Sequence, residues 1–558
     1  MPEGDLRKEF GSVARRYLGL FLLAALPRLA YLLVARPPFD SVYWALSDGL
    51  LRDGSLAVDG LKLTTHEPLY PLFLAVSRVL VRDGAFAVQW LQVAVASMGA
   101  LYLYRLAEAL TGRPRLATIS AVLYAGYPLL VRQAAQPSEL ALLTTVLIAF
   151  SCAFVTAATT AGAALAGVWL GLAVLTRTMM LPLLAFGAAV FLADRRPRAA
   201  LAFSLATLIV VCPLPIRNHG VNGSWWPTRS GLNLYIGNSP YTAAVLPTDD
   251  VDILQEQAQA VVARERPDLS PLAPGYQRVA DALLARRALA YMAERPLHTL
   301  AQKLWNVLYF FSPRLVPFHV ATPETRVVVG PAGEIGVENS EPRPLAEVIA
   351  YAASYSFVLV CAVAGVYLRR RDLRRDFMLW CIVVTVVAVH AVYFPASRYM
   401  APIVFVLLFY AGVALDAAMH GAMGAASRPR LGATKVAPSL HTRAAGPNFS
   451  SANTAGEIGQ QDVADGWKGR QTARIREAPH RHRGDDPGRK IELGGEASAL
   501  ENEEVEGRTD HLEKRFLAGE ALDAQAHGPA AAARFRVGQH VQRPERHEPA
   551  NRLARTER

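Results

Sequence analysis

The sequence predicts an all-α protein that crosses a membrane many times. Hydrophobic residues make up 52% of its 558 positions, and charged residues only 19%. Apolar segments of about 16–24 residues recur through roughly the first 420 positions, and each is near the length that a helix needs to cross about 30 Å of hydrocarbon. The helices of a soluble protein of this size would alternate apolar and polar faces instead. Short arginine-bearing loops separate the segments, as expected between membrane spans.

Ten of these apolar segments are predicted to be spans. They cover positions 17–35, 86–106, 116–131, 140–157, 162–176, 179–192, 199–213, 345–368, 377–394 and 400–418. The arginine-rich loops at 113–115, 195–198 and 369–375 belong in the cytoplasm, because Lys and Arg retain a loop there. Both termini are then cytoplasmic. This topology requires that the short apolar segment 69–80, which follows Pro68, lies at the outer interface instead of crossing.

The spans divide the chain into four predicted parts. These are an N-terminal membrane module at 1–215, an outer-face region at 216–344, C-terminal membrane helices at 345–420 and a tail at 421–558. The tail has almost no aromatic residues and no apolar periodicity, so we expect it to be a disordered cytoplasmic extension. The outer-face region is expected to hold helices near 251–265 and 276–311, and a hairpin at VVVGPAGEIG. The end of its second helix is amphipathic and aromatic, which is typical of a helix resting on the bilayer surface.

The formal net charge of +11 does not indicate a nucleic-acid partner. The basic residues cluster in the short loops between spans, where cytoplasmic retention accounts for them. The four cysteines lie inside apolar segments, and we interpret them as packing residues with no disulfide or metal spacing. His480 and His482 stand in the charged tail, where a solvated charge run is a simpler interpretation than a metal site.

A long loop at 36–82 follows the first predicted span and carries several acids. They are Asp40, Asp48, Asp53, Asp59 and Glu67. We interpret this loop as the cap of a membrane-embedded active site that also supplies the catalytic carboxylate. Two further polar segments, 132–139 and 216–344, share the outer face with it in the predicted topology.

Six segments carry a resemblance to a known family. In chain order they are PFDSVYWALSDGLLRDG, HEPLYPLF, QPSELALL, LTRTMMLPL, PIRNHGVNGSWWPTRSGLNLYIGN and ASRYMAPIVFVLL. Together they resemble the integral-membrane glycosyltransferases with the GT-C fold. They are most similar to the bacterial branch of the dolichyl-phosphate-mannose–protein mannosyltransferase family, which includes the aminoarabinose transferases. The resemblance covers roughly residues 15–418.

The resemblance implies a reaction in which a sugar moves from a polyprenyl phosphate to a lipid, polysaccharide or protein acceptor. It implies that the reaction takes place on the outer face of the cytoplasmic membrane. A carboxylate must accept the proton of the acceptor, and carboxylates stabilise the oxocarbenium-like sugar. Cations or helix N-termini should surround the leaving lipid phosphate. Direct displacement by the acceptor would invert the anomeric centre.

Three acids match acidic positions of the family. Asp40 matches the catalytic base, and it also precedes a helical pattern that it could cap. Ser41 stands where the family commonly has a second acid, which weakens any claim for a metal held by adjacent carboxylates. No cofactor is therefore assigned, and a divalent metal stays open. Glu139 is a second predicted catalytic residue, and Glu67 is predicted to bind substrate.

Three arginines are predicted to bind substrate as well. Arg177, Arg217 and Arg398 each lie where a predicted span meets the outer surface. Arginine often lies at such a rim for anchoring alone, but three on the acid-bearing face suit a clamp for the lipid phosphate. The alternative class is a transporter or lipid flippase, which would be expected to show inverted repeats and polar residues within broken spans. The acids here lie in outer loops instead.

Overall fold

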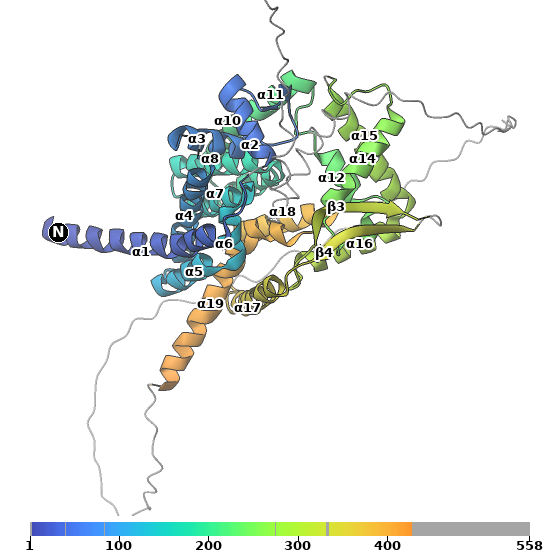
Figure 1. Ribbon diagram of the computed structural model, residues 1–558. Coiled ribbons are helices and arrows are strands. Elements are labelled where there is room, and N and C mark those ends of the chain that lie inside the picture. The colour runs from blue at the N-terminus through green and yellow to red at the C-terminus, as the bar shows by residue number, and fades with distance from the viewer. Residues whose placement is uncertain (1–2, 40, 83, 274, 331–333, 427–558) are drawn as a thin grey trace, which may run out of the picture. The chain divides into compact units, whose positions relative to one another are not determined.

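The computed structural model of the protein describes residues 3–39, 41–82, 84–273, 275–330 and 334–426 (Figure 1). Asp40 lies outside the described residues, and so does the predicted tail from residue 427 onward. Contacts divide the chain into two units, Met1–Ser427 with Gly507–Arg558, and Arg428–Glu506. All described residues belong to the first unit.

The described chain is largely helical. Its N-terminal part contains α1 Glu3–Ala35, α2 Val42–Asp53, β1 Ala57–Val58, β2 Leu61–Lys62, α3 Leu69–Leu80, α4 Ala85–Thr111, α5 Pro114–Gly126, α6 Pro128–Ala135, α7 Glu139–Val155, α8 Thr160–Thr176, the 3₁₀ helix η1 Thr178–Met180, α9 Pro182–Ala193, α10 Pro197–Val211 and α11 Pro213–Asn222. The outer-face region contains α12 Ser230–Gly237, α13 Thr242–Val245, η2 Val251–Leu254, α14 Gln255–Glu265, α15 Tyr276–Glu294, α16 Pro296–Phe310, β3 His319–Val329 and β4 Ile335–Pro342. The C-terminal part contains α17 Leu345–Leu368, α18 Phe377–Val392, η3 Ser397–Met400 and α19 Ala401–Ala426.

The predicted all-α polytopic membrane fold is confirmed, but its helices differ in length. In the described part of the chain, five helices are long and apolar enough to cross a membrane, and six if α6 and α7 count as one bent span. The predicted spans at α8, α9 and α18 are apolar helices of 17, 12 and 16 residues. They fall short of the roughly 20 residues that a perpendicular crossing needs. The number of full-length spans is therefore smaller than the ten predicted.

The predicted span at 116–131 is wrong, because the helix breaks in its middle. Helix α5 ends at Gly126, and Pro128 begins α6. Proline cannot continue a helix without clashing with the carbonyl four residues earlier, although it is well suited to the first turn of a new one. Helices α6 and α7 then meet at a bend of 119°. This bend places Glu139 at the first position of α7.

Two buried glutamines of α4 hold the bend. The Nε2 of Gln92 donates to the carbonyl oxygens of Ala134 at 2.9 Å and of Gln136 at 2.6 Å. The Nε2 of Gln89 donates to Ala135 O at 3.1 Å. These carbonyls lie where α6 ends and lack the donor that a continuing helix would supply, so the side-chain amides help to satisfy them.

The outer-face region follows the prediction with one correction. The helix predicted at 276–311 is two helices, because Pro296 ends α15 and begins α16. The predicted hairpin is confirmed: β3 pairs antiparallel with β4 from His319 opposite Pro342 to Val329 opposite Ile335. Helix α16 is amphipathic. It buries Thr299, Asn306 and Phe310, while the side chains of Leu297, Leu300, Leu304, Trp305 and Leu308 are exposed.

Close backbone contact joins α17 to α19 (Figure 1). A Cβ atom added at Gly365 would lie 1.9 Å from the carbonyl oxygen of Tyr410. A backbone atom cannot move aside as a side chain can, so we expect Gly365→Val to lower the free energy of unfolding by about 3 kcal/mol or more. Thermal unfolding of the detergent-solubilised protein, followed by tryptophan fluorescence, measures the loss. Gly19→Val is the matched control, because a Cβ there meets nothing within 4 Å.

Candidate active site

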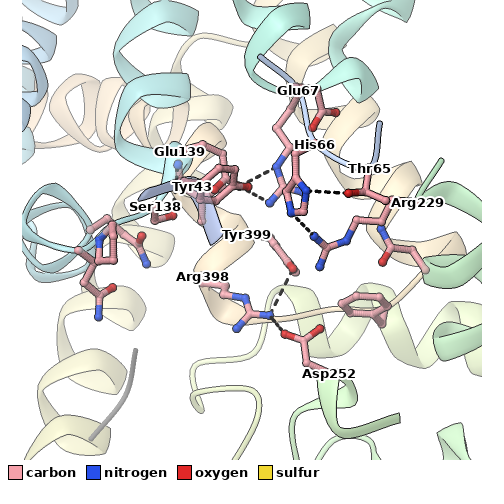
Figure 2. A pocket seen from close by; sticks show the side chains of 17 residues that line it. Tyr43, Thr65, His66, Glu67, Ser138, Glu139, Arg229, Asp252, Arg398 and Tyr399 are labelled. Carbon is pink, nitrogen blue, oxygen red and sulfur yellow. Dashed lines mark hydrogen bonds and ion pairs between the residues drawn. The ribbon is translucent and has the colours of Figure 1, made fainter. Parts of the chain in front are cut away.

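A polar cavity of about 80 Å³ collects residues from all three predicted outer segments (Figure 2). Its described lining consists of Tyr43, Thr65, His66, Glu67, Gln133, Gln136, Pro137, Ser138, Glu139, Leu140, Arg177, Arg229, Asn233, Asp252, Phe394, Arg398 and Tyr399. The structure thus brings together four of the six site residues predicted from the sequence, namely Glu67, Glu139, Arg177 and Arg398.

Arg177 and Glu139 form an ion pair in this cavity, in which the glutamate is buried and the arginine half-buried. Glu139 Oε1 accepts hydrogen bonds from Nε of Arg177 at 2.7 Å and from its Nη2. Only 5% of the Glu139 side chain is exposed. The guanidinium carbon of Arg177 also lies 5.6 Å from the ring centre of Tyr399. The carboxylate and the ring together fix the direction of the guanidinium group. These contacts favour an orienting role for Glu139 over the catalytic role predicted from the sequence.

Glu67 ties the first loop to the turn that carries Arg177. Its Oε1 accepts hydrogen bonds from the backbone N and from Oγ1 of Thr178, both at 2.9 Å. Thr178 begins η1 directly after Arg177. Glu67 is half-buried at the wall of the cavity. Its contacts position the arginine turn against the loop at 63–68.

Arg398 is held by two acids that the sequence analysis did not single out. Its Nη1 donates to Asp250 Oδ2 at 3.1 Å. Its Nη2 donates to Asp252 Oδ2 at 2.8 Å, as Figure 2 shows. Both carboxylates are more than nine-tenths buried. In the sequence they lie in a 130-residue polar region with many acids, so nothing there marked them as partners of a residue at the last membrane helix.

His66 is a further lining residue that was missed. Its Nδ1 lies 2.8 Å from Thr65 Oγ1, and Nη1 of Arg229 donates to its Nε2 at 2.8 Å (Figure 2). Because Nε2 accepts from Arg229, Nδ1 carries the proton and donates to Thr65. Burial lowers the pKa of His66 well below its usual value, and the charges of Arg229 and Arg177 lower it further. His66 is therefore a neutral imidazole in the folded protein.

The neutral His66 predicts a loss of stability in mild acid. In the unfolded chain its pKa returns to about 6.5, so the unfolded state binds a proton that the folded state does not. Its contribution to stability is complete above pH 6.5 and falls as the pH decreases below that value, by about 1.4 kcal/mol for each pH unit. Melting temperatures between pH 7.5 and 5 measure this. His66→Gln should flatten the pH dependence, whereas His298→Gln, which replaces an exposed histidine, should not.

Arg217 lies away from the described lining. Its Nη2 donates to the carbonyl oxygens of Leu56 at 3.2 Å and Leu63 at 2.6 Å, and its Nη1 donates to Asn218 Oδ1. Leu56 and Leu63 flank the short β1–β2 hairpin. Arg217 thus fastens the first outer loop to α11, and its contacts are those of a structural residue.

Asp40 lies outside the described residues, but its neighbours lie within them. Gln89 Nε2 donates to Pro37 O at 3.1 Å, which anchors the chain where it leaves α1. Phe39 and Ser41 are buried. Tyr43, in the first turn of α2, lines the cavity. The predicted role of Asp40 stays a prediction.

A second cavity of about 400 Å³ adjoins the first. The two share Thr65, Glu67, Arg177, Arg229, Asn233, Phe394 and Tyr399. The other residues of the second cavity are mostly apolar or aromatic, and they comprise Thr178, Met179, Leu181, Pro182, Trp226, Pro227, Ser230, Val389, His390 and Tyr393. Arg177 thus faces both a polar chamber and a more apolar one.

The described residues contain no group of three His, Cys, Asp or Glu side chains that could hold a metal ion. Glu67 and Glu139 each use one carboxylate oxygen for protein donors. Asp40 lies outside the described residues. The prediction that leaves a divalent metal open is therefore not tested.

Residues 65–216 match the family model described as dolichyl-phosphate-mannose-protein mannosyltransferase. Over this part of the chain, the match agrees with the family resemblance predicted from the sequence. The family description names a glycosyltransferase, which is the enzyme class predicted from the sequence. The matched residues include Glu67, Glu139 and Arg177 of the mannosyltransferase-like site. No curated protein matches the chain.

Solved structures give weaker likenesses. The oligosaccharyltransferase AglB of Archaeoglobus fulgidus, in complex with an inhibitory peptide and a dolichol-phosphate, is 15% identical with a TM-score of 0.41, over 74% of this chain and 52% of AglB. ArnT of Cupriavidus metallidurans in the apo state is 16% identical with a TM-score of 0.32, over 74% of this chain and 80% of ArnT. ArnT bound to undecaprenyl phosphate is 17% identical with a TM-score of 0.30. The chain spans about half the length of AglB.

Proposed function

We propose that this mannosyltransferase-like protein transfers a sugar from a polyprenyl-phosphate donor to an envelope acceptor, which is a lipid, polysaccharide or protein. The observation that carries the proposal is the meeting of Glu67, Glu139, Arg177 and Arg398 in one cavity. They come from the loop before α3, the start of α7, the end of α8 and η3, and a shared binding task explains why so many charged groups converge on one cavity. The family description names a lipid-phosphate-linked sugar as the donor.

In this proposal Asp40 is the general base. It takes the proton of the acceptor's nucleophilic group while that group attacks the anomeric carbon. The bond from the anomeric carbon to the lipid phosphate oxygen breaks on the opposite side, so the configuration inverts. The lipid phosphate leaves with its negative charge and needs no proton from the protein.

Arg177 and Arg398 neutralise the leaving phosphate. Their guanidinium groups stay fixed because Glu139 holds the first, and Asp250 with Asp252 holds the second. Fixed donors cost no reorganisation when charge develops in the transition state. The three carboxylates also reduce the repulsion between two cations that would otherwise face each other in a buried site.

The location of the site follows from the charge of the loops. We propose that the protein lies in the cytoplasmic membrane with both termini inside, which turns the cavity outward. Labelling with an impermeant maleimide tests this orientation in a variant whose four native cysteines are replaced. Asp59→Cys should react in intact cells and Arg371→Cys only after lysis, since both positions are exposed but belong to opposite faces. Equal labelling of both in intact cells would refute the topology.

Mass analysis of envelope glycans in a deletion strain tests the function. One sugar modification should be missing, and the wild-type gene should restore it while Asp40→Asn should not. The purified protein should then release free polyprenyl phosphate from the donor that carries this sugar. An unaltered envelope together with no release from any polyprenyl-phosphate sugar would leave the alternative of a transporter or flippase, which the family match disfavours.

A further inference from the structure

A third cavity lies within the outer-face region and has no role in the proposed reaction. Its volume is about 80 Å³, the same as that of the polar cavity of the candidate active site. It forms where helices α12, α14 and α15 pack together (Figure 1). Helices α14 and α15 supply most of its described lining, and the first outer loop closes one side of it.

The wall of this cavity mixes polar and apolar side chains. On α15 the lining includes Gln277, Asp281 and Leu284, which share one face of the helix because they are spaced by four and three residues. On α14 it includes Gln259 and Val262, which are spaced by three. A carboxylate and two carboxamides thus stand among aliphatic side chains on the helix faces that border the cavity.

Two of these polar side chains keep hydrogen-bonding capacity for a ligand. Among the described residues, the donors to Asp281 both contact Oδ1, namely the backbone N of Gly231 at 2.7 Å and of Leu232 at 3.1 Å. The side-chain amide of Gln259 has no hydrogen bond to the described chain. Asp281 and Gln259 are only half-buried, and neither has a side-chain atom among the described polar atoms that are sealed from solvent without a partner. A ligand in the cavity can therefore reach both groups.

The third cavity and the candidate active site share a wall. Thr65 lines the third cavity and the polar cavity alike. Thr228 lines the third cavity, while its neighbour in the chain, Arg229, lines the polar one. Gln277 holds this wall in place, because its Oε1 accepts hydrogen bonds from the backbone N and from Oγ1 of Thr64, both at 2.9 Å. A ligand in the third cavity thus lies one side chain away from the polar cavity.

The composition of the lining selects the chemistry of the ligand. The described lining holds one acid and no lysine, arginine or histidine, so an anionic group would be buried there without a cation to pair with. An alkyl chain would leave Asp281 and Gln259 without hydrogen bonds. A pyranose ring offers hydroxyl groups to the carboxylate and the carboxamide, and C–H faces to the aliphatic residues and the ring of Tyr276. A neutral saccharide therefore matches both parts of the wall.

We infer that the third cavity binds a neutral saccharide unit of the acceptor, so that the acceptor is a glycan chain. The inference rests on the proposed function and narrows its acceptor class. Oδ2 of Asp281 accepts a hydrogen bond from one hydroxyl group of this unit, and the amide of Gln259 bonds to another. The bound unit holds the next part of the same chain at the polar cavity, where transfer takes place. The third cavity positions the acceptor and takes no part in the bond changes.

Two substitutions test this cavity without changing the residues of the proposed reaction. Gln259→Leu removes the amide and costs the described chain no hydrogen bond. Asp281→Asn keeps an oxygen that can accept from the backbone of α12 but removes the charge. Glu256→Leu, at an exposed position of the same helix α14, is the matched control. Saturation-transfer NMR on the detergent-solubilised full-length protein measures the binding of neutral trisaccharides of mannose, glucose and galactose, of trilysine and of undecaprenyl phosphate.

At least one of the neutral trisaccharides should bind the wild-type protein. Gln259→Leu should weaken this binding by about 3- to 10-fold, the usual effect of one neutral hydrogen bond. Asp281→Asn should weaken it by about 10- to 100-fold, because hydrogen bonds to a charged group are stronger. Glu256→Leu should bind the trisaccharide as the wild type does, and all four proteins should bind undecaprenyl phosphate equally. Equal melting temperatures show that the fold is unchanged.

Equal trisaccharide binding by the wild type and by Gln259→Leu would overturn this inference and leave the proposed function intact. The absence of binding for every one of the neutral trisaccharides would do the same. Binding of trilysine that is lost in Asp281→Asn would overturn it in favour of a basic peptide. A wild type that does not bind undecaprenyl phosphate would overturn the proposed function and the acceptor role with it, while the trisaccharide data would still decide what the third cavity binds.

Discussion

Asp40→Asn is expected to lower the rate of sugar transfer by about 10²–10⁴-fold, the range that a positioned general base contributes. Asparagine keeps the size of the side chain and its hydrogen-bonding ability but cannot accept the acceptor's proton. The donor should therefore still bind, and the KM for the polyprenyl-phosphate sugar should change little while kcat falls. Release of polyprenyl phosphate from the purified protein, measured at saturating donor, reports kcat directly.

Asp53→Asn is the matched control for Asp40→Asn. Asp53 belongs to the same acid-bearing loop, but it lies exposed at the end of α2, so its substitution should leave transfer unchanged. Equal melting temperatures for both variants would show that neither disturbs the fold. Full activity of Asp40→Asn would remove Asp40 as the base and leave Glu67 as the next acid to test, because among the described residues its hydrogen-bond donors both contact Oε1.

Arg177→Ala should lower kcat/KM by about 10²–10³-fold, as the loss of one fixed donor to a developing anion does. The same substitution leaves Glu139 as a buried carboxylate without its cation, which is expected to destabilise the protein by about 3–5 kcal/mol. Activity and stability should thus fall together in this variant. Melting temperature and donor turnover are measured on the same preparation.

A double variant separates the two effects of Arg177→Ala. Adding Glu139→Gln removes the unpaired charge, so the melting temperature should recover while turnover stays low. Recovery of turnover with stability would mean that Arg177 acts only on the fold. Arg266→Ala is the control for losing an arginine, because Arg266 pairs with Asp268 at the exposed surface of the outer-face region.

The sequence predicted the chemistry of the site better than its geometry. Glu67 and Glu139 were predicted because they match acidic positions of the family. Arg177 and Arg398 were predicted because each lies where a span meets the predicted outer face, and the structure brings all four residues into one cavity. Arg217 met the same criterion, yet it binds the carbonyl oxygens of Leu56 and Leu63. Position at a membrane rim cannot distinguish an arginine that faces a cavity from one that fastens a neighbouring loop.

Other residues were missed for a related reason. Asp250 and Asp252 lie about 150 positions before Arg398 in the chain. Their ion pairs with Arg398 form only because the outer-face region folds back against it. In the sequence, His66 looks like an ordinary loop residue and His390 looks like an ordinary residue of an apolar helix. Their tautomers depend on Arg229 and on the carbonyl of Phe394, and these contacts have no signature along the chain.

By itself the sequence determined the polytopic helical fold, the amphipathic face of α16 and the outer hairpin, and it carried the family resemblance. Each follows from local composition, periodicity or motif, and the apolar length of a segment is the main signal of a membrane span. Only the tertiary structure decided that helix 116–131 breaks at Pro128, that Glu139 holds Arg177, and that Asp250 and Asp252 hold Arg398. Those facts depend on packing between distant segments, and the energy of a buried charge or acceptor is set by the groups that surround it in space.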